Sequence, residues 1–158
     1  MTSAQASMPA RRDDPNEPGD NAMDRDLIRA RIAHHECGHA VIARAVGLTV
    51  TRVKIRRNGG YVRLGEFHPE QADAELRFFY AGRHAEARLL TEHGYSRARA
   101  LRITKTHASH DLKQVRSIVK WMQRHHDQRL NTRRAERDAA RLVDSHWNAI
   151  ARMAAGHC

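Results

Sequence analysis

The stretch RIAHHECGHAVIARAVG, residues 31–47, carries the pattern from which the fold of this chain can be inferred. Within it, His35, Glu36 and His39 match H-E-x-x-H, in which two histidines one helical turn apart can bind one metal ion. The chain holds 12 histidines, so the match needs support from its surroundings. That support is a stripe of apolar residues on the same helical face, namely Ile28, Ile32, Ile42 and Val46. The stretch therefore predicts a helix over residues 24–46 whose buried face carries both histidines.

The glutamate of the pattern indicates a chemical role. Glu36 directly follows His35, so its carboxylate would lie beside a metal ion instead of binding it. From there it could take a proton from water whose pKa the metal has lowered toward about 7. Two buried histidines that only form hydrogen bonds are the alternative, but the matching offset of Glu36 favours metal binding.

A catalytic zinc ion usually has three protein ligands, so the pattern leaves one to be found. Ile42 and Ala45 stand where a metzincin has glycine and histidine, and the thermolysin-like glutamate position falls in a predicted hairpin turn. Asp111, 72 residues after His39, is the best candidate, because it shares a helical stripe with apolar residues at 115, 118 and 122. A carboxylate buried there would need a cation.

Other interpretations of this region stay open. Asp111 could instead cap the N-terminus of its helix, a role for which Ser109 is also suitable. The third metal ligand could also come from elsewhere. The remaining candidates are His107, His110, Glu86 and, less favoured, His146.

The other patterns predict a mostly α-helical fold with one small antiparallel β-hairpin. Residues 48–55 and 61–67 alternate like half-buried strands, and Asn58-Gly59-Gly60 between them is suited to a tight turn. Pro69 opens a further helix, which Gly94 closes. After a connecting segment, two more helices are predicted, over residues 111–126 and 132–155.

Length and composition indicate one domain that does not cross a membrane. Residues 1–22 are polar and contain several prolines, so they are predicted to form a disordered tail before a single domain over residues 23–158. The sequence has no long apolar run and no signal peptide. Its two cysteines, Cys37 and Cys158, do not form a disulfide framework. We therefore expect a cytoplasmic protein without a membrane span.

The net charge of +10 raises the question of an acidic partner. The basic residues are spread over three stretches, 52–57, 97–105 and 124–141, and the last of these also holds acidic residues. No aromatic residues alternate with them as a stacking platform for single strands would require. A solvated arginine-rich surface is therefore favoured over nucleic-acid binding.

Four stretches, in this order, resemble the peptidase domain of FtsH-type proteases, which are membrane-anchored AAA+ zinc proteases. They are HHECGHAVIARAVG, VKIRRNGGYVRL, YAGRHAEARLL and THASHDLKQVRSIVKWM. The family pattern has an HEAGHA helix, a hairpin with a glycine-rich turn, a GGR-AEE helix and a T-GASND-L segment. The resemblance spans about residues 26–125 and implies a zincin-type helical peptidase domain over residues 23–158.

The resemblance implies a role for each matching residue. His35 and His39 correspond to zinc-binding histidines, Glu36 to the catalytic glutamate, and Asp111 to an aspartate ligand. Glu86 corresponds to the first glutamate of AEE, which could orient a ligand histidine. The strand over residues 49–55 corresponds to the edge where extended substrate is thought to pair.

The sequence also departs from the family pattern. Cys37 stands where the family has alanine, and Ala87 replaces the second glutamate of AEE. His107 replaces glycine and His110 replaces asparagine near Asp111, so either histidine could alter the metal ligands. The ATPase module and the transmembrane helices of the family have no counterpart, so we expect substrates that are already unfolded.

Residues and resemblance together predict a zinc-dependent metallopeptidase, with Zn²⁺ as cofactor, that hydrolyses peptides or unfolded segments. A separate ATPase partner and a homo-oligomer both stay open. The alternative in another class is a catalytically inactive, zinc-stabilised binding or regulatory module. A basic nucleic-acid-associated protein is the third interpretation, and it predicts binding that collapses steeply as salt rises.

Overall fold

Helix α1 (Arg25–Ala45) lies where the H-E-x-x-H stretch predicts it. The Asp24 side chain caps its start by accepting a hydrogen bond from the backbone N–H of Leu27 at 2.7 Å. Its end is followed by Gly47, whose φ of +82° is a left-handed conformation that glycine adopts without strain. Local sequence chemistry therefore sets both ends of the helix that carries the histidines.

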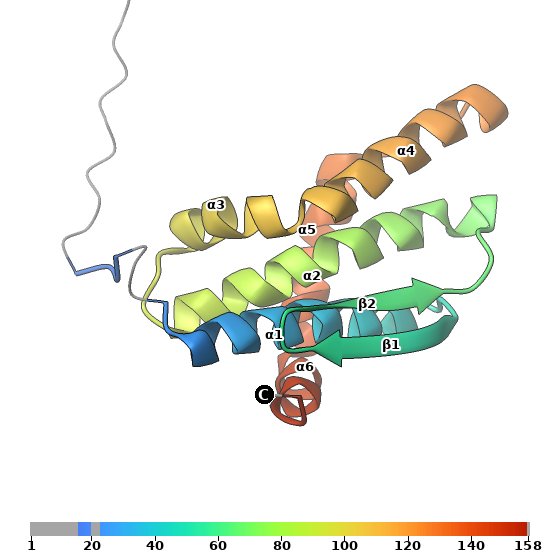
Figure 1. The fold of residues 1–158 in the computed structure, drawn as a ribbon. Helices are drawn as coiled ribbons and strands as arrows, with labels where there is room; N and C mark the ends of the chain where they lie inside the picture. Colours follow the sequence, from blue (N-terminus) through green and yellow to red (C-terminus); the bar gives the residue numbers. More distant parts are fainter. Residues whose placement is uncertain (1–15, 20–22, 158) are drawn as a thin grey trace, which may run out of the picture.

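The computed structural model describes residues 16–19 and 23–157 of the chain. These residues form six α-helices, one 3₁₀ turn and one antiparallel hairpin (Figure 1). After α1 the elements are β1 (Val50–Arg56), β2 (Gly59–Leu64), η2 (Pro69–Gln71), α2 (Ala72–Glu92), α3 (Arg97–His107), α4 (Ser109–His126), α5 (Thr132–Ser145) and α6 (Trp147–Ala155). The prediction of a mostly helical fold with a small antiparallel hairpin is confirmed.

Helices α1 and α2 form the centre of the molecule and pack on each other along their length. At Gly38 of α1 they approach so closely that a Cβ atom there would lie 2.6 Å from the Cβ of Ala85. In Figure 1 the hairpin runs along α1, whereas α3 and α4 lie along α2. α5 crosses behind α2, and α6 packs against α1. The two central helices are thus covered on several sides.

The core follows this arrangement. One cluster joins α1, α2, α5 and α6, and it includes Cys37, Ile42, Ala85 and Trp147. Trp147 is buried in this cluster and contacts the ring of His34 with centroids 5.3 Å apart. A second cluster joins α2, α4 and α5. On the α1 stripe Ile42 is buried but Ile28 is exposed, because its neighbours Leu27 and Ala30 make the core contacts instead.

Three local predictions were wrong. The connecting segment after Gly94 contains a helix, α3, which the Ser96 side chain caps by accepting a hydrogen bond from the Arg99 N–H. The predicted helix over residues 132–155 is divided at His146 into α5 and α6. The hairpin turn consists of residues 57–58, because Arg56 pairs with Gly59 in the strand register. The two glycines thus belong to β2.

The predicted tail, residues 1–22, lies mostly outside the described residues. Within residues 16–19, the Glu17 carboxylate accepts hydrogen bonds from the Ser96 N–H at 3.2 Å and from Arg99, also at 3.2 Å. Among the described residues, none of the helices combines the length and the hydropathy that a membrane crossing requires.

Candidate metal centre

Helices α1 and α4 bring three side-chain atoms together at one point. His35 Nε2 and His39 Nε2 lie 3.1 Å apart, as expected for histidines one turn apart on α1. Asp111 Oδ2, from the first turn of α4, lies 3.0 Å from His35 Nε2 and 3.2 Å from His39 Nε2. All three residues are buried. The residues predicted as metal ligands thus form a compact group that could hold a metal ion.

The opposite nitrogens of both rings are occupied, which determines where the rings point. His39 Nδ1 donates a hydrogen bond to the backbone carbonyl of Phe78 at 2.7 Å. Because a carbonyl can only accept, the neutral ring of His39 has its lone pair on Nε2, directed at the group. His35 Nδ1 lies 3.3 Å from Glu86 Oε2, so this carboxylate orients the second ring.

The charges of the group favour a cation between its members. Burial lowers the pKa of His35, but hydrogen bonds and charges from Asp111 and Glu86 outweigh burial and raise the pKa to about 10. Burial raises the pKa of Asp111, yet the hydrogen bond and the positive charge of His35 hold it well below its usual range. In the metal-free protein a proton on His35 therefore balances the aspartate.

The donor atoms also fit a metal ion chemically. A proton on His35 Nε2 can satisfy Asp111, but it leaves the lone pair of His39 Nε2 facing the same carboxylate oxygen. One divalent cation would satisfy all three atoms at once. Two imidazole nitrogens and one carboxylate oxygen are a ligand set that Zn²⁺ accepts, with a further position left for water or substrate.

A second group, His35, Glu86 and His107, also brings potential ligand atoms together. Glu86 Oε2 lies 2.9 Å from His107 Nδ1, and the other oxygen, Oε1, pairs with Arg31 at 2.6 Å. Burial raises the pKa of Glu86, but hydrogen bonds from His107 and His35 outweigh it and lower the pKa to about 2. Because Arg31 already neutralises this carboxylate, the group with Asp111 is the better cation site.

Glu36 lies beside the histidines without belonging to either group of ligand atoms. Its carboxylate is buried, and burial raises its pKa, although the positive charge of His35 acts in the opposite direction. The hairpin covers it, since a Cβ at Gly60 of β2 would lie 2.7 Å from Glu36 Cγ. A buried carboxylate with a raised pKa is a stronger base than an exposed one, which suits it to proton transfer.

The other residues considered from the sequence lie elsewhere or act differently. Asp111 faces the core on one stripe with Val115, Ile118 and Met122, and no side chain caps the start of α4. His110 is exposed and lies 3.5 Å from Gln114. His146 lies at the junction of α5 and α6, where its ring contacts the Leu142 carbonyl. Within the part of the chain that the structure describes, neither of these histidines joins a group that could hold a metal.

Sequence reasoning missed the residues that shape the site from α2 and α1. Gly82 leaves room for both imidazoles, the Phe78 carbonyl orients His39, and Arg31 pairs with Glu86. A signal for Gly82 was present, because a glycine inside a long helix costs about 1 kcal/mol relative to alanine and usually has a packing reason. No pattern could reveal a backbone carbonyl as a partner.

Comparisons with protein-family models, with curated proteins and with solved structures each return no match for the chain.

Proposed function

We propose that this protein is a zinc-dependent peptidase of the FtsH-like type. The observation that carries the proposal is the meeting of His35 Nε2, His39 Nε2 and Asp111 Oδ2 within 3.2 Å of one another, with the buried carboxylate of Glu36 beside them. Two histidines, one carboxylate and an adjacent general base are the parts that metal-assisted hydrolysis needs.

Each residue has a distinct task in this mechanism. His35, His39 and Asp111 would hold the metal, while Glu86 and the Phe78 carbonyl keep the two rings in orientation. A bound Zn²⁺ would supply Lewis acidity, which polarises a peptide carbonyl and makes water more acidic. Glu36 accepts the proton of the attacking water and returns it to the amine that leaves.

The resemblance of the sequence to FtsH-type peptidase domains supports the same function. The motif residues of that family fall on α1, on α2 and at the start of α4, the three helices that meet at the site. We propose peptides and unfolded segments as substrates, because an extended chain is the form of polypeptide that a peptidase site cleaves. A separate ATPase would extend this range to folded proteins.

One observation favours a second function, a binding or regulatory module with a structural metal ion. The exposed fractions of His35, His39 and Asp111 are 4%, 3% and 9%, and that of Glu36 is 7%. A closed site of this kind is typical of metal ions that stabilise a fold, whereas a catalytic site must admit substrate. Such a module would bind the metal but cleave nothing.

The variant Glu36→Gln separates the two functions. If the protein is a peptidase, the variant keeps its zinc but loses cleavage of a fluorogenic peptide mixture by a factor of at least about 100. Glu70→Gln removes an exposed carboxylate in η2 and is the matched control, with full cleavage expected. Unchanged cleavage in Glu36→Gln would reject the mechanism, and zinc binding without cleavage in the parent protein would establish the module.

A further inference from the structure

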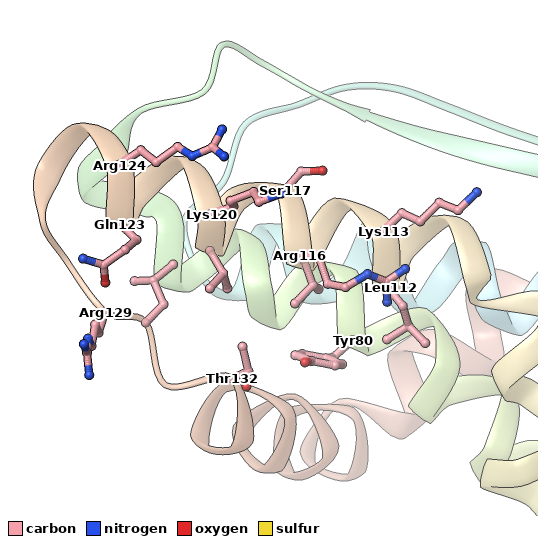
Figure 2. A pocket seen from close by; sticks show the side chains of 13 residues that line it. Tyr80, Leu112, Lys113, Arg116, Ser117, Lys120, Gln123, Arg124, Arg129 and Thr132 are labelled. Carbon is pink, nitrogen blue, oxygen red and sulfur yellow. The ribbon is translucent and has the colours of Figure 1, made fainter.

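A groove runs between α4 and the beginning of α5, on the outside of the second core cluster. Its volume is about 1020 Å³. Figure 2 shows Tyr80, Leu112, Arg116 and Thr132 between the two helices, while Lys113 and Arg124 point away from α5. A groove of this volume between two helices can accept an extended or helical segment of another protein.

The floor of the groove is apolar. Leu112, Val115 and Val119 follow one another along α4 at helical spacing, and Leu130 continues the row after the helix ends. Leu112, Val119 and Leu130 are only half-buried, so part of their apolar surface stays in contact with water. Burying that surface against a partner would be favourable.

The rim of the groove carries only positive charge. Five of its lining residues are cationic, and none is acidic: Lys113, Arg116, Lys120, Arg124 and Arg129. Four of them follow α4 at steps of three, four and four residues, so they form a stripe beside the apolar one. Within residues 16–19 and 23–157, the ion pairs of the structure involve none of the five. The nearby Glu136 is engaged with Arg83 at 3.1 Å.

We propose that this groove binds an acidic amphipathic helix of a partner protein. The apolar face of such a helix would cover Leu112, Val119 and Leu130, and its carboxylates would meet the cationic stripe of α4. Nucleic acid fits less well, because the floor offers apolar side chains and a buried tyrosine instead of exposed aromatic rings for stacking. The cationic residues occupy the exposed side of α4, whereas Asp111 occupies its buried side, so binding needs neither metal nor cleavage.

A pair of labelled peptides tests the inference with the full chain. The first is a helical peptide of about 16 residues with leucines on one face and glutamates on the other, a length at which isolated helices become stable. The second has lysine in place of every glutamate. Fluorescence anisotropy should detect binding of the acidic peptide and none of the basic one.

Two double variants localise the binding. Arg116→Glu with Lys120→Glu should weaken binding of the acidic peptide by at least about tenfold, because both charges face its carboxylates. Arg102→Glu with Lys105→Glu makes the same change in net charge on the exposed side of α3 and should leave binding unchanged. Val119→Ser should weaken binding without changing the charge. Circular dichroism of each variant checks that it is folded.

Several results would overturn the inference. The acidic peptide could fail to bind, or it could respond equally to both double variants, which would indicate general attraction to a basic surface. A single-stranded oligonucleotide could bind more tightly than the peptide and be lost with Arg116→Glu and Lys120→Glu, which would assign the groove to nucleic acid. A change of molar mass in the same variant would assign the groove to a second copy of the chain.

Discussion

Gly82 of α2 lies against His39 of α1 so closely that a Cβ atom at position 82 would overlap the Nε2 atom of His39. The same Cβ would come within 2.8 Å of His35 Nε2. The two imidazoles of the candidate metal centre therefore occupy space that is free only because position 82 of α2 is a glycine.

Replacing Gly82 with alanine should disrupt the metal centre. Alanine favours a helix over glycine by about 1 kcal/mol, so any loss must come from the displaced rings and not from α2 itself. We expect zinc affinity to fall by at least about tenfold, as measured by competition with a chelator dye. Gly65→Ala is the control, because its Cβ would make only an ordinary contact of 3.5 Å with Thr49. Equal zinc affinity in both variants would show that the rings tolerate the methyl group.

Replacing Asp111 should distinguish the two groups of potential ligands. Asp111→Ala removes the only carboxylate of the first group, so the zinc content of the purified protein should fall from about one per chain to nearly none. His107→Ala should leave zinc in place, because His107 belongs only to the second group. His110→Ala serves as the control for removal of an exposed histidine nearby. The reverse result, with zinc lost only in His107→Ala, would move the metal to Glu86 and His107.

The hairpin should influence cleavage through Gly60. A Cβ at this position would lie 2.7 Å from Glu36 Cγ and 2.6 Å from the Lys54 carbonyl, so alanine must move either the glutamate or the strand. If the protein is a peptidase, we expect kcat to fall by at least about tenfold while zinc content is unchanged. Gly65→Ala again provides the comparison on the segment after β2. A loss of zinc together with activity would point to a general disturbance of α1.

The stability of the metal-free protein should depend on pH through His35. Its pKa is about 10 in the folded chain and 6.5 without the fold, so its contribution is complete below about pH 6.5 and is lost as pH rises through about 10. Asp111 and Glu86 have lowered pKa values, so their contributions are present at neutral pH and are lost as pH falls into the acid range. Urea unfolding at a series of pH values should show both losses.

A histidine variant isolates the alkaline part of this profile. His35→Gln should flatten the decrease in the free energy of unfolding toward pH 10, while the exposed His125→Gln should not. Zinc should displace the proton from His35, so its apparent affinity should rise with pH over the same range. An alkaline decrease that is as steep in His35→Gln as in the parent chain would assign it to other groups.

The sequence was sufficient to predict which faces of α1 and α4 are buried, because helical spacing determines those faces. His35 and His39 are four residues apart, and Asp111 heads a stripe with Val115 and Met122, so periodicity alone placed all three on buried faces. The convergence of α1 and α4 could not be derived from spacing. It depends on the packing of both helices against α2.

Sequence analysis missed α3 and the break between α5 and α6, where the residue pattern is weak. α3 is strongly basic and buries only Ala100 and Thr104, so it lacks the apolar stripe by which a helix is recognised, although Ser96 is a suitable cap. The break at His146 has neither proline nor glycine to announce it. There the chain turns because α5 packs on α2 and α6 packs on α1, a requirement of tertiary structure.

His39 and Asp111, which meet at the candidate metal centre, are separated by 72 residues of chain. A metal ion bound to both would act as a cross-link that closes this loop. In the chain-entropy model a covalent link over such a loop contributes about 4 kcal/mol by restricting the unfolded ensemble. Metal uptake and folding are then one coupled equilibrium, in which the ion joins the first helix to the fourth, and a chelator would act as a denaturant of this protein.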